Sequence, residues 1–216
     1  LALSEAGGLI LAAALVALRM SRNRVVSGAA TGYCYFFRGT PLLAQLYLVY
    51  YGAAELHMEL DAIGLWGILR DALPCVLLAF ILNTAAYKAE VLLGAIRSVP
   101  AGQVEAASAL GLKRLALYWK VVLPQAVIVA LRPLANETAK MVKASALASI
   151  VTVLDLLGTT KVIYADTFDF DIYYVAAAVY LAFIEGLRVA VGFIESRLIR
   201  HLQGLAKVTF PLSIAV

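Results

Sequence analysis

The sequence predicts an all-α membrane protein with five transmembrane helices and one charged segment at the cytoplasmic face. Of the 216 residues, 63% are apolar and 15% are charged, and the mean hydropathy is +0.88; soluble domains are roughly half apolar and a quarter charged. At about 20 residues per span, the length allows about five spans and leaves no room for an ATPase or another large soluble domain. We therefore predict a single transmembrane domain over residues 1–216.

The charged residues fall in short clusters beside the apolar runs. The net charge is +4, and cations arranged in this way are typical of membrane orientation signals rather than of a nucleic-acid surface. Cys34 and Cys75 lie in apolar stretches without CxxC or Cys/His spacing, which indicates neither a disulfide framework nor a metal site. Because the chain starts at Leu1 without a Met, we expect natural sequence to precede it.

The first apolar run covers residues 6–18 and is followed by Arg19, Arg22 and Arg24. Cations collect on the cytoplasmic side of membrane spans, so this end is predicted to be inside and the N-terminus outside. The run is short for about 30 Å of hydrocarbon. A moderately apolar stretch, 25–37, follows it and holds a GxxxG pattern, which permits close helix approach.

Gly39 and Pro41 interrupt the helical pattern before the second predicted span, residues 42–54. The following stretch, 55–71, is rich in acidic residues and poor in cations. It is therefore predicted to lie outside. The third predicted span, 73–96, returns the chain to the cytoplasmic side.

A cytoplasmic connection is predicted over residues 98–120, and a fourth span is expected to begin near Val121. The polar residues of that span must face protein or water rather than lipid. They include Arg132, Asn136, Glu137 and Lys140. An acidic run at 166–171 marks the outside again, residues 172–193 form the fifth predicted span, and the cations after it place the C-terminus inside.

The connection between the third and fourth spans has the pattern of two short helices with a turn between them. Pro100 suits a first helical turn, Glu105 lies near the positive end of the helix dipole, and Gly111 can end the helix in a left-handed cap. We expect small residues to let a partner approach closely and apolar residues to contact it. The small residues are Ala106, Ala107 and Ser108, and the apolar residues are Val104, Leu110 and Leu112. The alternative is a plain amphipathic loop helix.

The residues Glu105-Ala106-Ala107, Gly111 and Val121-Val122-Leu123-Pro124 resemble the EAA signature of permease subunits of binding-protein-dependent ABC importers. Only Val121 departs from the signature, which usually has Ile. The strings at 37–42 and 83–87, with 94–100 downstream, are similar to the polar amino-acid branch of that family, which includes histidine, arginine and opine-like systems. The likeness extends over about residues 10–202.

This resemblance implies the type I ABC importer permease fold, with a coupling helix that docks into a cleft on an ATP-binding subunit. The residues that it implicates in ATPase coupling are Glu105, Ala106, Ala107, Gly111, Leu123 and Pro124. It also implies two ATP-binding subunits, a second permease subunit that is identical or different, an extracytoplasmic solute-binding protein, and a bacterial inner membrane. The sequence lacks a GxxxxGK[ST] phosphate loop, so ATP and Mg²⁺ are expected on a partner, and this chain is expected to be neither an enzyme nor a cofactor carrier.

The predicted function is therefore import of polar, basic amino acids or related opines. An intramembrane enzyme would need a GxSG serine with a His, an HExxH helix or paired aspartates within spans, and the sequence has none of these. The remaining alternative is a secondary, ion-coupled transporter or a membrane scaffold subunit. An inverted repeat would support it, and none is visible.

Glu137, beside Asn136, is the first candidate for the substrate path, because a partly dehydrated carboxylate suits an ammonium or guanidinium group. The structural alternative is an internal ion pair with Lys140 or Arg132. Lys140 is not expected from the resemblance. An extra cation there could hold the second carboxylate of an opine or could neutralise Glu137.

Further path candidates are Asn83 and Tyr87, which share a helix face with Glu90. Glu90 has the alternative of pairing with Lys88 or Arg97 near the interface. Gln45 on the second span is the last candidate, and its alternative is a hydrogen bond between helices.

Overall fold

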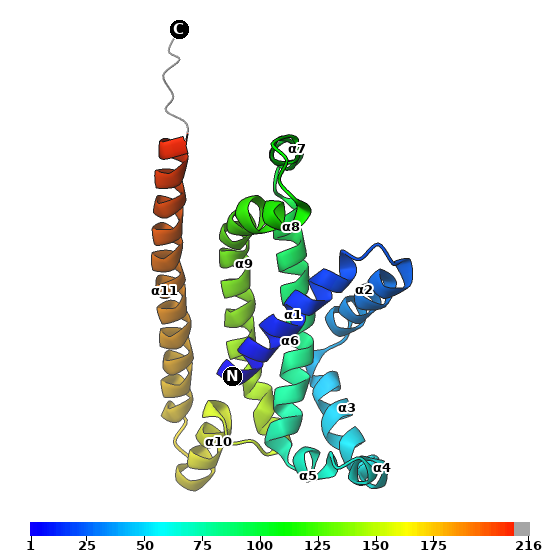
Figure 1. Ribbon diagram of the computed structural model, residues 1–216. Helices are drawn as coiled ribbons and strands as arrows, with labels where there is room; N and C mark the ends of the chain where they lie inside the picture. Colours follow the sequence, from blue (N-terminus) through cyan, green and yellow to red (C-terminus); the bar gives the residue numbers. More distant parts are fainter. Residues whose placement is uncertain (210–216) are drawn as a thin grey trace.

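The computed structural model describes the backbone through Thr209 and the side chains through Arg197, and this part is helical without a strand (Figure 1). In chain order the helices are α1 (Ala2–Arg19), α2 (Arg24–Gly39), α3 (Leu42–Glu55), α4 (His57–Ala62), α5 (Trp66–Leu69), α6 (Ala72–Arg97), α7 (Ala101–Ala109), α8 (Arg114–Leu117), a π-helical turn (Tyr118–Val122), α9 (Leu123–Ala144), a 3₁₀ segment (Ser145–Val151), α10 (Leu156–Thr167) and α11 (Asp171–Thr209).

Four helical segments of the described chain are long and apolar enough to cross a membrane. They are Ala2–Arg19, Ala72–Arg97, Arg114–Val151 and Asp171–Arg197. The second predicted span corresponds to α3, which has 14 residues. At 1.5 Å per residue it reaches about 21 Å, less than the hydrocarbon thickness. The predicted second span, residues 42–54, thus agrees in its bounds with α3, a short helix that follows α2 across a break.

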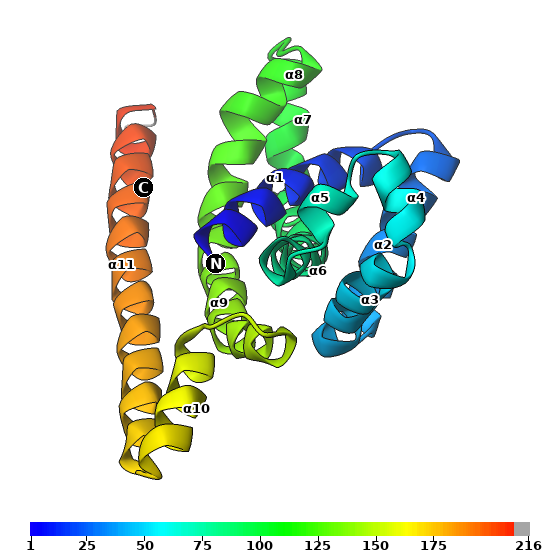
Figure 2. The ribbon, with the colours of Figure 1, turned by 90° about the horizontal axis from the view of Figure 1, so that it is seen from below.

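The long helices alternate in direction. In Figure 1, α6 rises toward α7 and α8, α9 descends from them, and α11 rises again, while α4, α5 and α10 lie at the opposite end. The helix α1 crosses α6 obliquely in the same view. Figure 2, seen from below, shows α11 beside α9 and apart from α2 and α3. The segment between the third and fourth predicted spans therefore projects at one end of the molecule.

Helix α6 is the centre of the fold and α11 is its periphery. In the most apolar stretch of α6, 56% of the residues are buried inside the chain, whereas in the most apolar stretch of α11 none are. Small residues let α1 pack closely on α6: Ala12, Ala85 and Ala89 are fully buried in one cluster. A Cβ added to Gly8 would lie 2.8 Å from Cγ2 of Thr84, so only glycine fits at this crossing.

The break between α2 and α3 is held by side-chain hydrogen bonds to the end of α2. Gln45 Nε2 donates to the carbonyl oxygens of Phe37 at 2.8 Å and Thr40 at 3.1 Å, which satisfies groups that a helix terminus leaves free. The predicted interruption at Gly39 and Pro41 is confirmed. The GxxxG pattern at 28–32 has a different outcome, since a Cβ added to either glycine would meet no heavy atom within 4 Å. It mediates no close helix contact within the described chain.

Candidate coupling segment and polar path

Helix α7 ends in the left-handed cap that the sequence predicts. Gly111 has a φ of +78°. The N–H of Leu112 donates to the carbonyl of Ala107 at 3.2 Å, and the N–H of Gly111 donates to that of Ser108 at 3.0 Å, which is a Schellman arrangement. Pro100 is the N-cap residue, just before the first turn. The chain therefore reverses tightly after α7 and enters α8.

One face of α7 packs against the segment that follows it. Ala107 is 5% exposed and lies in a cluster with Leu117 and Val122, against which Val104 and Leu112 also pack. Ala107, Val104 and Leu112, whose contact with a partner stays a prediction, fill the space between α7 and the start of α9. They hold the segment in place.

The opposite face of α7 is open. Glu105, Ala106 and Ser108 are exposed, and Leu110 is 82% exposed. The Glu105 carboxylate has no ion-pair or hydrogen-bond partner in the part of the chain with described side chains. An anion and an apolar side chain are thus presented on a projecting, internally braced helix (Figure 1).

The rest of the EAA-like string forms the bend into α9. Residues Tyr118–Val122 form a π-helical turn that runs directly into α9, and Pro124 lies in the first turn of α9, next to this irregularity. Leu123 and Pro124 are both half-buried. The Gln125 amide also donates to Gln103 Oε1 of α7 at 2.6 Å. Leu123 and Pro124 therefore shape the bend, whereas Glu105 and Ala106 occupy the open face.

The candidates Gln45 and Asn83 lie together, but their polar atoms are engaged. Both are buried, at 4% and 6% exposed. Asn83 Nδ2 donates to Gln45 Oε1 at 2.9 Å and to the Phe37 carbonyl at 3.3 Å. This geometry matches the structural alternative given for Gln45, a link between helices.

Tyr87 and Glu90 belong to a charged cluster at the ends of α1 and α2. Glu90 Oε1 accepts from Nη1 of Arg19 at 2.7 Å and pairs with Nη1 of Arg38 at 3.1 Å. The expectation that Glu90 pairs with Lys88 or Arg97 is therefore wrong. The Tyr87 hydroxyl donates to the Arg38 carbonyl at 3.4 Å, and the Arg38 guanidinium carbon is 5.8 Å from the centre of the Tyr87 ring.

Glu137 and Asn136 are adjacent in sequence but have different surroundings. Glu137 Oε1 accepts from Lys140 Nζ at 2.7 Å, and its side chain is 16% exposed. This is the internal pair that was the structural alternative, with Lys140 rather than Arg132. Asn136 instead lines a groove of about 370 Å³ between α9 and α11.

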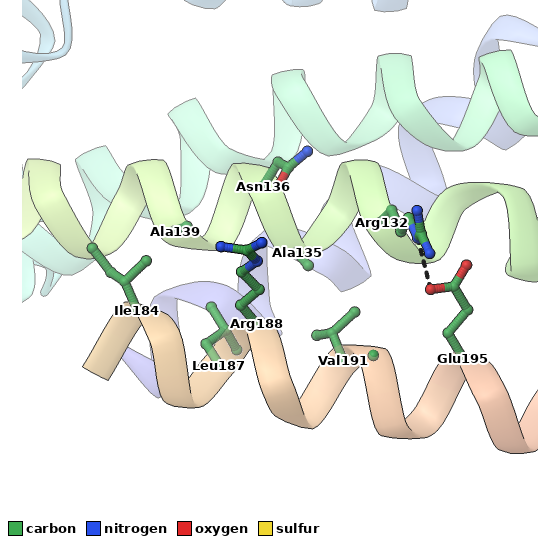
Figure 3. A pocket seen from close by; sticks show the side chains of 10 residues that line it. Arg132, Ala135, Asn136, Ala139, Ile184, Leu187, Arg188, Val191 and Glu195 are labelled. Atoms are coloured by element: carbon green, nitrogen blue, oxygen red, sulfur yellow. Dashed lines mark hydrogen bonds and ion pairs between the residues drawn. The ribbon is translucent and has the colours of Figure 1, made fainter. Parts of the chain in front are cut away.

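The groove has charged groups at both helices (Figure 3). Arg132 Nε donates to Glu195 Oε2 of α11 at 2.7 Å, and Arg188 extends from α11 toward α9. Apolar side chains, among them Ile184 and Val191, line the remainder. The arrangement can accommodate a small polar molecule with an apolar part.

Sequence reasoning missed the most buried ion pair. Lys88 Nζ lies 2.8 Å from Glu5 Oε2, although Glu5 precedes the first apolar run, residues 6–18, and Lys88 was considered only as a partner of Glu90. The available signal was a lysine in the middle of a span, because such a charge requires a partner. No group of three His, Cys, Asp or Glu side chains up to Arg197 could hold a metal ion.

Residues 8–200 match the family described as binding-protein-dependent transport system inner membrane component. The nopaline transport system permease protein NocM of Agrobacterium fabrum is 39% identical over 81% of this chain and 73% of its own length. The histidine/lysine/arginine/ornithine permease protein HisM of Escherichia coli is 40% identical over 84% and 76%.

Solved structures agree with the sequence relatives. An amino acid ABC transporter crystallised with histidines superposes with a TM-score of 0.80 at 30% identity, over 90% of this chain and 87% of that one. The MetNI methionine ABC transporter in an inward-facing form shares the fold, with a TM-score of 0.72 at 16% identity over 90% and 89%. This chain belongs to the binding-protein-dependent transport system inner membrane components, as an ABC importer permease subunit of the amino-acid and opine branch.

Proposed function

We propose that this permease subunit imports polar, basic amino acids or related opines and is driven by ATP-binding subunits that grip α7. The second permease subunit, two ATP-binding subunits and an extracytoplasmic binding protein complete the transporter. The names of the relatives support the cargo class, since they specify nopaline, octopine, and histidine, lysine, arginine and ornithine transport.

The observation that carries the coupling proposal is the projecting, braced α7 with its open acidic face. The helix lies at the end where Arg97, Lys113 and Arg114 are exposed, and the positive-inside rule favours the cytoplasm for that end. A cationic cleft on an ATP-binding subunit would complement Glu105. The helix α6 leads directly into α7, and α9 follows α7 through α8 and the π-helical turn. A displacement of α7 would therefore be transmitted to two membrane helices.

The α9 and α11 side of the molecule is the proposed route for cargo. Arg188 and Lys140 are exposed within long apolar segments, and such charges are costly in lipid. We infer that this side faces the second permease subunit or water. An amino acid with a side-chain cation could approach Glu137, and a second carboxylate could approach the neighbouring cations.

Glu137→Gln is expected to weaken uptake of cationic cargo more than it weakens assembly. The substitution keeps the shape and removes the charge opposite a substrate ammonium or guanidinium group. We expect the apparent KM for arginine or lysine to rise by about tenfold, which is about 1.4 kcal/mol. Glu59→Gln, at an exposed position of α4, is the control. Unchanged uptake kinetics in Glu137→Gln would remove this carboxylate from the path.

The whole proposal is tested by uptake into proteoliposomes that contain the permeases, the ATP-binding subunits and the binding protein. Arginine, lysine, histidine, octopine and nopaline form the panel. We expect uptake to require ATP on the side of the vesicle membrane that corresponds to the cytoplasm. We also expect it to favour basic amino acids or opines. Uptake driven by a proton or sodium gradient without ATP would support the secondary-transporter alternative instead.

A further inference from the structure

Lys88 is a buried cation in the most buried helix of the protein. Its side chain is 5% exposed, and its only anionic partner in the described chain is Glu5 of α1, whose side chain is 15% exposed. Nζ lies 2.8 Å from Glu5 Oε2 and 3.1 Å from the Glu5 carbonyl oxygen. Breaking such a pair leaves an uncompensated buried charge, so each partner strongly constrains the other.

A third helix joins the same carboxylate oxygen. Thr138 of α9 donates from Oγ1 to Glu5 Oε2 at 2.5 Å. The other carboxylate oxygen, Oε1, is buried without a hydrogen-bond partner. A single carboxylate oxygen of α1 therefore accepts from side chains of both α6 and α9, while Arg19 at the other end of α1 makes a separate link to Glu90 of α6.

The surrounding packing leaves little freedom to replace these links. One turn along α1 from Glu5, Gly8 meets Thr84, which is itself one turn along α6 from Lys88; an added Cβ on Gly8 would clash at 2.8 Å. The helices α1 and α6 are thus in close contact beside the ion pair. Separating them would expose the charges to the membrane interior.

We propose that Glu5, Lys88 and Thr138 form an intramembrane joint, named here the α1 joint, that makes α1, α6 and α9 move as one body. The helices α6 and α9 are the two arms that flank α7. The two arms also pack directly on each other near α7, through Ala95 of α6 and Ala126 and Ala130 of α9. The joint adds a link farther along both helices, so that without it a displacement of α7 is transmitted less completely. The three residues are positioning residues, and their part in coupling rests on the proposed transport function.

The joint is tested with Lys88→Met, Glu5→Gln, the neutral double variant Glu5→Gln/Lys88→Met and the exchanged pair Glu5→Lys/Lys88→Glu. Arg70→Met, which removes an exposed cation near Asp71, is the matched control. Two quantities are measured on the assembled transporter: the temperature at which half of the permease aggregates, and the number of arginine molecules imported per ATP hydrolysed.

We expect Lys88→Met to lower the aggregation temperature by about 5 °C or more and the import-to-hydrolysis ratio by about threefold or more. The neutral double or the exchanged pair should recover part of both losses. Thr138→Val, which keeps the ion pair, should lower the ratio with a smaller change in stability. Normal values of both quantities in Lys88→Met would overturn the joint. So would losses in the neutral double variant that equal the sum of the losses in the two single variants.

The two hypotheses fail in different ways. If the unmodified transporter showed no ATP-driven uptake, the proposed function would be wrong, and the stability cycle would still decide whether Glu5 and Lys88 are paired. If uptake were normal and Lys88→Met lowered only the aggregation temperature, the ion pair would be structural and its role in coupling would be refuted.

Discussion

Replacement of Gly111 by Trp is expected to abolish ATP-driven uptake while the permease remains folded in the membrane. The φ of +78° at this position costs an ordinary L-residue about 1–2 kcal/mol, so the turn after α7 would be distorted. A Cβ there meets no heavy atom within 4 Å, so the indole would project outward toward the partner rather than into the core. Uptake and co-purification of the ATP-binding subunit should both be measured.

Gly111→Asn is the matched control, because asparagine tolerates the left-handed region and adds less bulk. It should retain most of the uptake. Normal ATP-dependent uptake by Gly111→Trp would contradict the assignment of α7 as the coupling segment. Loss of the Trp variant from the membrane would contradict the claim that the effect is local.

Glu105→Arg is expected to separate the permease from its ATP-binding partner. The substitution reverses the charge on the open face of α7 without touching the cluster around Ala107. If Glu105 meets cationic groups in the partner, an attraction becomes a repulsion, and like-charge contacts at an interface cost several kcal/mol. The expected result is at least a tenfold loss of ATP-driven uptake, about 1.4 kcal/mol, with reduced co-purification.

The control for this prediction is Glu59→Arg, which makes the same charge change on exposed α4 at the opposite end of the molecule. It should leave co-purification intact. Wild-type uptake by Glu105→Arg would show that this carboxylate faces no cationic partner. An equal loss in both variants would point to an effect of net charge rather than of position.

Sequence patterns predicted the long helices because hydrophobic length and Gly/Pro interruptions are local properties. The break at Gly39 and Pro41 and the cap at Gly111 were found in this way. The bounds of α3 were found in the same way, because Pro41 precedes the apolar run and Glu55 ends it. The glycines at 28–32 mediate no close helix contact in the described chain, because a permissive pattern does not specify which helix approaches it.

Pairings between distant residues were the hardest to predict. Glu90 was assigned to charges on its own helix, whereas α1 and α2 bring Arg19 and Arg38 to it. The packing of Ala107 on Leu117 was likewise not predicted, because the motif shows that the residue is small but not which segment of its own chain it contacts. In both cases the contact depends on how the helices pack against each other, and this packing cannot be predicted from the sequence of one helix alone.

The central claim is that the open face of α7 contacts an ATP-binding subunit, and site-directed cross-linking tests it most directly. Leu110→Cys, at a position 82% exposed on this face, should cross-link to the ATP-binding subunit, with a yield that changes when ATP is added. Met58→Cys, 72% exposed on α4, is the matched control. The native Cys34 and Cys75 are buried. A cross-link from Met58→Cys, with none from Leu110→Cys in an active transporter, would contradict the claim.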